Sequence, residues 1–302
     1  MIINKDNLTA IIVSYYRGDR LKICLESLKD LKNITVWDNN TKGEELDKIK
    51  KIEYDIPHVK FIYSEENWGL NRPFNQSIIN STTDWVLLTC DDMIFNDDWL
   101  EVLNDILKEK PQLEQIYLNT FNAWVLHKKT IVRMGWFDEE YRYYPNMEDD
   151  DWYLRIVETL GYSPYGGIPQ HLENVLPDWY QKIAVKLNYQ EWQFKAEDNF
   201  TFFCNSKHNK KHKIIGKETN TGDVLDAGSR NNIKAQIESP KGMTGVEYHF
   251  TKWKQITDIM DLFNDDTYFS KDSRAYKRIH PESDPYPEIR KQYAKKYFNI
   301  EL

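Results

Sequence analysis

The chain has 302 residues, about two domains' worth, and with 40% hydrophobic and 29% charged residues it is not a disordered protein. The 40 basic and 48 acidic residues give a net charge of −8, which argues against a nucleic-acid partner. Three widely spaced cysteines exclude a disulfide framework and a cysteine-rich zinc site. The sequence contains neither a signal peptide nor an apolar run of the roughly 20 residues that a membrane span needs. We therefore expect a soluble, cytoplasmic protein.

Short apolar runs alternate with amphipathic segments in the first half of the chain. The run over residues 8–14 predicts a buried strand, and the runs over 34–37, 59–63 and 85–88 predict three further strands. Between them, Asp19 is placed to cap a leucine-rich helix, Pro73 suits a first helical turn, and Asp98 with Glu101 has the spacing of a capping box. This alternation predicts an α/β fold with a doubly wound, mostly parallel sheet, whose ligands bind beyond the carboxyl ends of the strands.

The pattern changes near residue 181, where helical segments are separated by polar, glycine- and asparagine-containing stretches. We place a domain boundary near Asp178, with one α/β domain over residues 1–178 and a mainly helical accessory region over 179–302. Two helices are expected in the accessory region, from the spacing of Trp253, Ile256, Met260 and Phe263 and from that of Ile289, Tyr293 and Tyr297.

An acidic pair, Asp91-Asp92, closes the apolar run that begins at Trp85. Two adjacent carboxylates repel each other unless a positive charge lies between them, and Mg²⁺ or Mn²⁺ is a suitable cation. The alternative is a helix cap or a solvated turn, where aspartate is common. His171 becomes a candidate metal ligand only if the fold brings it to Asp92.

A second acidic cluster, Glu148-Asp149-Asp150-Asp151, opens a predicted helix that ends at Gly161. The helix dipole favours acids in the first turn by roughly 0.3–1 kcal/mol each, which accounts for one or two of them. Four consecutive acids exceed what capping needs. Helix capping is therefore one interpretation of the cluster, and the other is that it contains a general base.

Six motifs follow one another in a characteristic order. They are Ser14-Tyr15-Tyr16, Val36-Trp37-Asp38-Asn39-Asn40-Thr41, Asn67-Trp68-Gly69 with Asn75, Leu87-Leu88-Thr89-Cys90-Asp91-Asp92, Gly135-Trp136-Phe137-Asp138-Glu139, and Glu148-Asp149-Asp150-Asp151-Trp152-Tyr153-Leu154-Arg155. Over about residues 8 to 175 the sequence resembles the GT-A glycosyltransferases, specifically the inverting family 2. The last motif is the most specific part of this resemblance.

The resemblance implies a donor site and a metal site. The residues implied to bind the nucleotide sugar are Ser14, Tyr15, Tyr16, Asp38, Asn67, Asn75 and Asp91. Asp92 and His171 are implied to hold Mn²⁺ or Mg²⁺ on the diphosphate. The sequence departs from the family at one position, because Cys90 stands where the family has the first aspartate of its Asp-x-Asp motif.

The resemblance also implies an acceptor site. Asp149, together with Glu148, is implied to deprotonate the acceptor hydroxyl. Trp152, Asp151 and Trp124 are candidates for acceptor contacts, with core packing as the alternative for both indoles. The family favours a UDP-sugar donor and a glycan or other hydroxyl acceptor. Residues 179–302 are expected to shape the acceptor site or to form a homo-oligomer contact.

Two other functions remain open at the level of sequence. A sugar nucleotidyltransferase also uses a doubly wound sheet and metal-bound carboxylates, but it needs a glycine-rich phosphate loop, for which the chain offers only Arg17-Gly18-Asp19-Arg20. A non-catalytic binding scaffold is supported only by Cys90. The basic run Lys207–Lys217 could contact an anionic acceptor, with a solvated loop as the simpler interpretation.

Overall fold

The computed structural model describes residues 2–119, 122–142, 148–159, 201–203 and 284–301. Three expectations lie outside these ranges: the candidate metal ligand His171, the helix expected around Trp253 and the basic run that begins at Lys207. The region around the expected boundary at Asp178 lies outside them as well.

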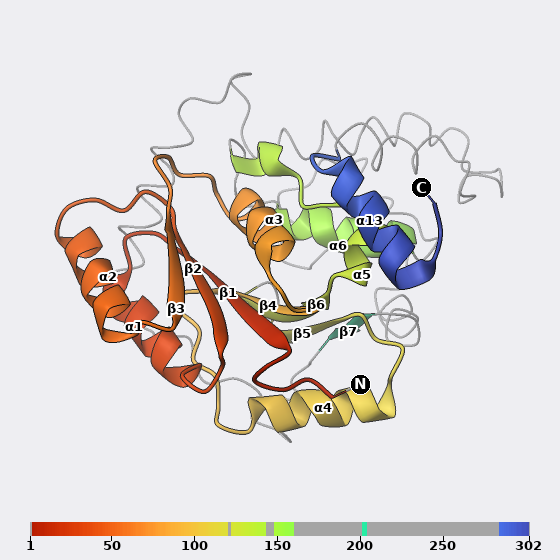
Figure 1. Cartoon of the computed structure of the whole chain (residues 1–302), viewed down its shortest axis with the longest axis horizontal. Coiled ribbons are helices and arrows are strands. Elements are labelled where there is room, and N and C mark those ends of the chain that lie inside the picture. The colour runs from red at the N-terminus through yellow and green to blue at the C-terminus, as the bar shows by residue number, and fades with distance from the viewer. Residues whose placement is uncertain (1, 120–121, 143–147, 160–200, 204–283, 302) are drawn as a thin grey trace, which may run out of the picture.

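The centre of the fold is a seven-stranded sheet with the strand order β3-β2-β1-β4-β6-β5-β7 (Figure 1). The strands are β1 (Leu8–Ser14), β2 (Asn33–Asp38), β3 (Val59–Tyr63), β4 (Trp85–Cys90), β5 (Gln115–Asn119), β6 (Ala123–His127) and β7 (Thr201–Phe203). Strands β1 to β4 are parallel to one another, and β6 runs antiparallel to both β4 and β5. Among the described strands, β6 alone is reversed, so the predicted mostly parallel, doubly wound sheet is confirmed.

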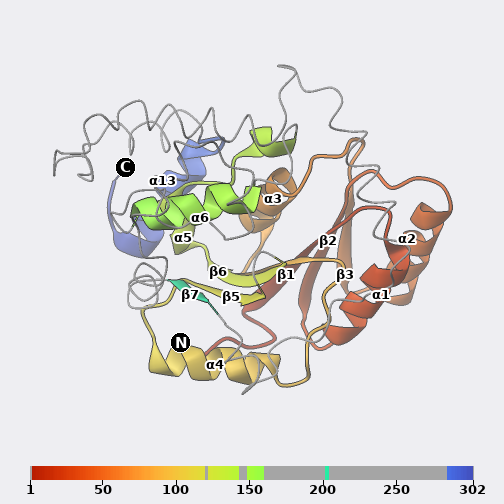
Figure 2. The same ribbon diagram turned by 180° about the vertical axis from the view of Figure 1, so that it is seen from behind.

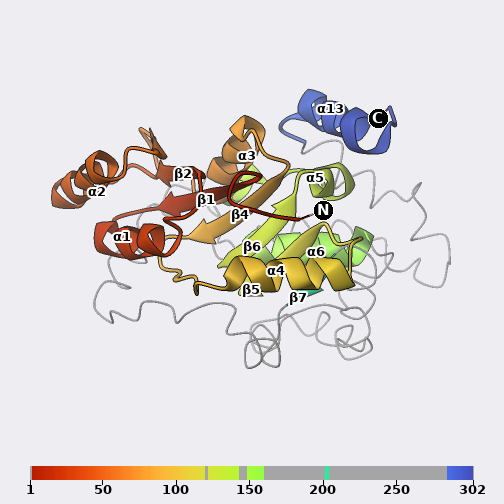
Figure 3. The ribbon, with the colours of Figure 1, turned by 60° about the horizontal axis from the view of Figure 1, so that its bottom comes forward.

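Helices cover both faces of the sheet. They are α1 (Gly18–Ser27), α2 (Glu44–Asp55), α3 (Asn71–Asn80), α4 (Trp99–Glu109), α5 (Lys129–Met134), the 3-10 helix η1 (Glu139–Arg142), α6 (Glu148–Thr159) and α13 (Pro287–Phe298). Helices α1, α2 and α4 share one apolar cluster, and α3, α5, α6 and α13 contact the other. Figure 2 shows α3 and α6 over the same face, and Figure 3 shows α4 and α13 on opposite sides of the sheet.

Strand β1 shows why the sheet needs both layers. Every residue of β1 is buried, as the continuous apolar run predicts for a central parallel strand. Ala10 and Ile12 pack into the cluster with α1, α2 and α4, whereas Ile11 and Val13 pack into the opposite one. Side chains alternate across a strand, so a strand that is apolar at every position requires cover on both faces.

The helix starts differ in detail from the sequence prediction. Asp19 lies within the first turn of α1, whose N-cap residue is Arg17. Asp98 is the N-cap residue of α4, but its side chain forms no capping hydrogen bond. A capping residue normally has an extended backbone, whereas Asp98 has φ −96° and ψ 4°. The predicted capping box of Asp98 with Glu101 is therefore wrong, because its side-chain hydrogen bond does not form.

The C-terminal helix α13 is the helix predicted from Ile289, Tyr293 and Tyr297, and it packs beside α5. The buried Arg290 side chain donates a hydrogen bond of 2.8 Å from Nη2 to the Val132 carbonyl oxygen. Lys296 forms an ion pair with Asp84 at 2.6 Å. The last helix of the chain therefore packs onto the α/β unit. None of the helices in the described part of the chain is long and apolar enough to cross a membrane.

Helix α13 helps to bury His127 at the end of β6. The imidazole packs edge-on against the rings of Trp85 and Tyr297, with centroid distances of 4.9 and 5.1 Å. Burial, together with the charge of Lys129, lowers the pKa of His127 to about 4. The folded protein therefore keeps this side chain neutral at pH values where a free histidine is protonated.

This burial predicts a pH-dependent loss of stability. Between pH 6.5 and about 4 the unfolded chain binds a proton at His127 that the folded chain does not, so the free energy of unfolding decreases as the pH falls, by about 3 kcal/mol at most. In His127→Gln this part of the pH dependence should disappear. Urea unfolding at pH 7 and pH 4.5 measures it, with exposed His58→Gln as the matched control. If His127→Gln retains the wild-type pH dependence, the assignment is wrong.

Candidate active site

The candidate site lies where the strand order of the sheet reverses. The chain leaves β1 toward β2 on one side, whereas β4 lies on the other side and continues toward β6. In register, Ser14 at the end of β1 pairs with Asp38, and Val13 pairs with Cys90. Strands β1, β2 and β4 are parallel, so their carboxyl ends meet at one edge. Doubly wound sheets bind ligands at this switch point.

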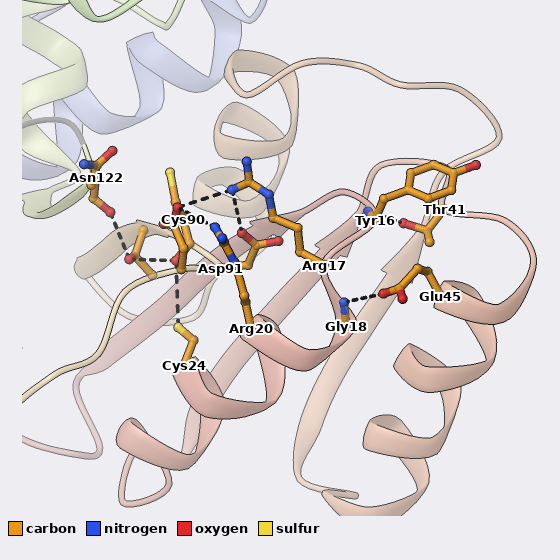
Figure 4. A network of polar contacts seen from close by, with 12 residues as sticks. Tyr16, Arg17, Gly18, Arg20, Cys24, Thr41, Glu45, Cys90, Asp91 and Asn122 are labelled. Atoms are coloured by element: carbon orange, nitrogen blue, oxygen red, sulfur yellow. Dashed lines mark hydrogen bonds and ion pairs between the residues drawn. The ribbon is translucent and has the colours of Figure 1, made fainter. Parts of the chain in front are cut away.

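The acidic pair follows β4 directly and is held by arginine. The Arg17 Nη1 atom lies 3.4 Å from Asp91 Oδ1 and 3.3 Å from Asp92 Oδ2 (Figure 4). Arg20 approaches Asp92 Oδ2 from the same helix, at 3.8 Å. The remaining oxygens, Asp91 Oδ2 and Asp92 Oδ1, are buried without a hydrogen-bond partner among the described residues. Two carboxylate oxygens are thus available to a further donor or cation.

The carboxyl group of Asp91 is strongly affected by its surroundings. Its residue is 2% exposed, and burial raises its pKa to about 6. The Arg17 guanidinium opposes this shift, and the charge of Asp92 adds to it. A buried, perturbed carboxyl group in a ligand-binding crevice is a common feature of functional sites, since a bound cation would stabilise its charged form.

Cys90, the last residue of β4, is affected by charges from both acidic clusters. Burial raises the pKa of the Cys90 thiol well above its ordinary value, and the charges of Asp92 and Asp91 raise it further. The charge of Glu148, in the first turn of α6, adds to this effect. The structure therefore brings Glu148 close enough to the end of β4 to act on the thiol. Without a metal the Cys90 thiol therefore stays protonated at neutral pH, and sulfur is in addition a soft ligand that hard cations such as Mg²⁺ do not favour.

Asp149, the expected base, is the second residue of α6 and is half-buried. It lies next to Glu148 at the helix N-terminus, where the helix dipole stabilises a carboxylate. The charge of Glu148 acts on Cys90 at the end of β4, so the N-terminus of α6 lies near that end of the sheet.

A second group of side chains surrounds the end of β2. Asp38 is 1% exposed, and its Oδ2 atom accepts a 3.0 Å hydrogen bond from the Thr41 N–H. Its Oδ1 atom is buried with no partner in the described part of the chain, and burial raises the pKa of Asp38. Burial also raises the pKa of the Tyr15 hydroxyl. The charge of Asp38 raises this pKa as well, whereas a hydrogen bond with the Asn67 side chain lowers it. Tyr15, Asp38 and Asn67 thus form one polar cluster with an acceptor oxygen free for a ligand.

The turn after β1 has a strained backbone. Tyr16 has φ +56°, which is unusual for a bulky residue, and its N–H donates a 3.0 Å hydrogen bond to Thr41 Oγ1. Strain of this kind persists only where the surroundings hold it, and it concentrates at functional sites. Sequence reasoning did not select Thr41 as a site residue, although it is the last residue of the second motif.

Asn39 has a similar positioning role, which sequence reasoning also missed. Its side-chain amide donates a 2.7 Å hydrogen bond to the Gly69 carbonyl oxygen, and its Oδ1 accepts one of 3.0 Å from the Trp68 N–H. The indole of Trp68 packs against two guanidiniums, with Arg72 Cζ at 3.5 Å and Arg142 Cζ at 3.9 Å from the ring centroid. The turn that carries Asn67 is therefore fixed from both sides.

Asn75, an expected donor-binding residue, has its amide occupied within the protein. Its Nδ2 donates to the Phe137 carbonyl oxygen at 2.8 Å and to Glu139 Oε1 at 3.1 Å, and its Oδ1 accepts a 3.1 Å hydrogen bond from the Phe137 N–H. Asn75 is fully buried on α3. Its position therefore corrects the expectation: Asn75 joins α3 to the 137–139 segment.

The residues expected to contact the acceptor are also packed inside the protein. Trp124 and Trp152 are both 0% exposed, and Trp152 stacks on Phe137 with a centroid distance of 4.0 Å. Asp151 is 2% exposed and forms a 2.9 Å ion pair with Arg155. An indole without exposed surface has no face to offer a sugar ring, so the structure assigns these side chains to the core instead.

The mostly parallel, doubly wound sheet with helices on both faces is a Rossmann-like fold of the GT-A type. Residues 9–149 match the model of glycosyl transferase family 2. This part of the chain belongs to that family, and the protein is a glycosyltransferase. No curated protein matches the sequence.

Solved structures with similar folds are distant. The mannosyltransferase PcManGT from Pyrobaculum calidifontis, in complex with GDP-Man and Mn²⁺, is 11% identical, with 78% of this chain and 83% of that chain covered and a TM-score of 0.38. Residues 1–349 of S. aureus TarS are 13% identical, with coverages of 87% and 89% and a TM-score of 0.41. The same protein in complex with UDP is 12% identical, with coverages of 77% and 80% and a TM-score of 0.42.

The conformation of Gly69 yields a test of the turn that carries Asn67. Gly69 has φ +67°, and a Cβ atom there would lie 3.3 Å from Arg142 Cα, whereas Gly43, with φ +64°, has nothing within 4 Å of such an atom. Gly43→Ala should cost about 1–2 kcal/mol through its backbone conformation alone. Gly69→Ala should cost more, because Arg142 must also move. Urea unfolding of the two variants measures the difference, and equal losses would contradict the close packing.

Proposed function

We propose that the protein is a metal-dependent, inverting glycosyltransferase that moves a sugar from a nucleoside diphosphate sugar to a hydroxyl group of a glycan or other glycoconjugate. One observation carries the proposal. Asp91 and Asp92 lie at the switch point of the sheet, and each has a buried carboxylate oxygen without a hydrogen-bond partner among the described residues. The family's preference makes a UDP-sugar the favoured donor.

The chemistry of the donor set fits Mn²⁺ or Mg²⁺. Hard divalent cations take oxygen ligands, and Mg²⁺ in particular uses one or two carboxylates completed by substrate phosphates. Asp92, assisted by Asp91, offers such oxygens. The described residues contain no group of three His, Cys, Asp or Glu side chains placed to hold a metal ion. His171, which lies outside the described residues, and the phosphate oxygens of the donor would complete the shell. A bound cation would neutralise the charge that develops on the leaving diphosphate.

The nucleoside would bind beside this pair. Asp38 Oδ1 is a buried acceptor that suits an N–H group of the base or a ribose hydroxyl. Tyr15, Tyr16 and Ser14 border it at the end of β1, and Asn67 approaches Tyr15 from the turn after β3. The hydrogen bonds from Asn39 and Thr41 hold these turns in place before the donor binds, so less order has to be created on binding.

The acceptor hydroxyl would be activated from α6. Inversion requires in-line attack at the anomeric carbon, and Asp149 would take the proton from the attacking hydroxyl. The neighbouring charge of Glu148 would favour the positive, oxocarbenium-like transition state. Residues 179–302 would shape the acceptor site or an oligomer contact, with α13 holding the end of this region against α5.

The nucleotidyltransferase alternative loses its main support in the structure. Such an enzyme needs a basic loop that surrounds phosphates near the N-terminus. The Arg17 side chain instead contacts the Asp91 and Asp92 carboxylates. The non-catalytic alternative differs from our proposal in one measurable outcome, because a binding scaffold would take up the donor without transferring the sugar.

The base assignment predicts a separation of binding from transfer. Asp149→Asn should bind the donor with nearly wild-type affinity but transfer its sugar about 10²–10⁴-fold more slowly, because a neutral amide cannot accept the proton. A screen of nucleotide sugars with Mn²⁺ by thermal shift identifies the donor, and transfer and hydrolysis assays follow. Asp55→Asn, an exposed aspartate on α2, is the control. Turnover close to that of the wild type would exclude Asp149 as the base.

The metal assignment predicts a loss of metal-dependent binding. Asp92→Ala removes one of the two carboxylates, so Mn²⁺ should no longer strengthen the binding of UDP or GDP as it does in the wild type. Titration calorimetry with each nucleotide, with and without Mn²⁺, measures this effect. If the Mn²⁺-dependent gain in affinity is the same in both proteins, Asp92 is not a metal ligand.

A further inference from the structure

Arg17 occupies the space between the two carboxylates that would hold the cation. A single guanidinium nitrogen, Nη1, lies within 3.4 Å of both Asp91 and Asp92, and the Arg17 side chain is 18% exposed. Arg20 supports Asp92 from the next turn of α1 and is nearly buried. Each carboxylate thus has one oxygen facing arginine and one buried oxygen without a partner among the described residues.

The backbone holds Arg17 in this position. Arg17 follows the strained Tyr16 and is the N-cap residue of α1. On its other side, the Gly18 N–H donates a 3.0 Å hydrogen bond to Glu45 Oε2 (Figure 4). A Cβ atom on Gly18 would lie only 2.9 Å from Lys48 Cβ, so α1 and α2 are in close contact here. The turn is fixed from both directions, and the Arg17 side chain extends from it toward the end of β4.

The charges within this group balance. Asp91 and Asp92 contribute two negative charges, and Arg17 and Arg20 contribute two positive ones. A divalent cation that bound alone would leave two uncompensated positive charges in mostly buried surroundings, which is unfavourable. The acidic start of α6, from which Glu148 acts on the adjacent Cys90, would offset part of this charge. A nucleoside diphosphate brings negative charge together with the cation and restores the balance.

We propose that Arg17 is a built-in counter-ion, which occupies the carboxylate pair in the ligand-free protein and makes the divalent cation and the nucleotide diphosphate bind as a pair. The inference rests on the proposed function and concerns the same site. Arg17 acts here as a positioning residue: it keeps Asp91 and Asp92 together without metal, and it competes with the cation for their oxygens. Cation and nucleotide should therefore each strengthen the binding of the other by the same factor.

The test measures the binding of Mn²⁺ alone, from the electron paramagnetic resonance signal of the free ion. Arg17→Gln should bind Mn²⁺ about tenfold or more tightly than the wild type, because the competing cation is gone, and UDP should strengthen this binding less than it does in the wild type. Lys22→Gln is the matched control, since it removes one positive charge from an exposed position of the same helix. Unchanged or weaker Mn²⁺ binding by Arg17→Gln would overturn the proposal.

A second variant tests whether the positive charge of Arg17 is what weakens the binding of Mn²⁺. Arg17→Lys keeps the positive charge and should bind Mn²⁺ alone as weakly as the wild type does. If Arg17→Lys binds Mn²⁺ as tightly as Arg17→Gln, charge is not the cause and the proposal fails. Far-ultraviolet circular dichroism verifies that each variant is folded.

The nucleotide measurements distinguish this proposal from the proposed function. If no nucleotide or nucleotide sugar binds the wild-type protein with Mn²⁺, the proposed function fails, and so does the paired binding of cation and diphosphate. If nucleotides bind and Arg17→Gln leaves the affinity for Mn²⁺ alone unchanged, the role of Arg17 fails and the proposed function stands.

Discussion

The site depends on one electrostatic constraint, the proximity of two carboxylates at the carboxyl end of β4. Asp91 is nearly inaccessible to solvent, so its charge cannot be stabilised by water. In the described structure the pair is neutralised by Arg17, the N-cap residue of α1, and by Arg20 within α1, the helix that follows β1. The adjacency of β1 and β4 in the sheet is therefore what brings charge and counter-charge together.

The surrounding turns are held by hydrogen bonds between segments that are remote in sequence. Asn39 joins the end of β2 to the turn after β3, and Thr41 joins it to the strained Tyr16 after β1. On the other side, Asn75 fixes the 137–139 segment against α3. The same network leaves the buried Oδ1 atom of Asp38 without a partner among the described residues. The turns around this oxygen are thus fixed by hydrogen bonds within the protein.

Helix α13 is connected to the same network of hydrogen bonds through the residue that precedes it. The Tyr286 hydroxyl, just before α13, donates a 2.5 Å hydrogen bond to Glu139 Oε1, which also accepts from Asn75. Gln76 on α3 donates to the same hydroxyl at 2.7 Å. Helix α13 is therefore connected to the elements that border the candidate donor site, although it lies far along the chain from them.

The sequence by itself determined the elements and the type of site. The apolar runs predict strands β1 to β4, of which β1 and β4 are buried along almost their whole length. The helical spacing of Ile289, Tyr293 and Tyr297 predicts α13, and the ordered motifs indicate the family. These features are local, because strand and helix periodicity are read directly from neighbouring residues. The acidic character of the two clusters is equally visible without a structure.

Only the tertiary structure decided which of these side chains remain available. The motif containing Asn75 cannot show that Phe137 and Glu139 occupy its amide, and the aromatic character of Trp124 and Trp152 does not reveal that both are fully buried. The bridging position of Arg17, too, follows from the pairing of β1 with β4 rather than from its own neighbours in sequence. Contacts between remote segments depend on packing, and a one-dimensional pattern of polarity does not encode which partner each polar atom finds.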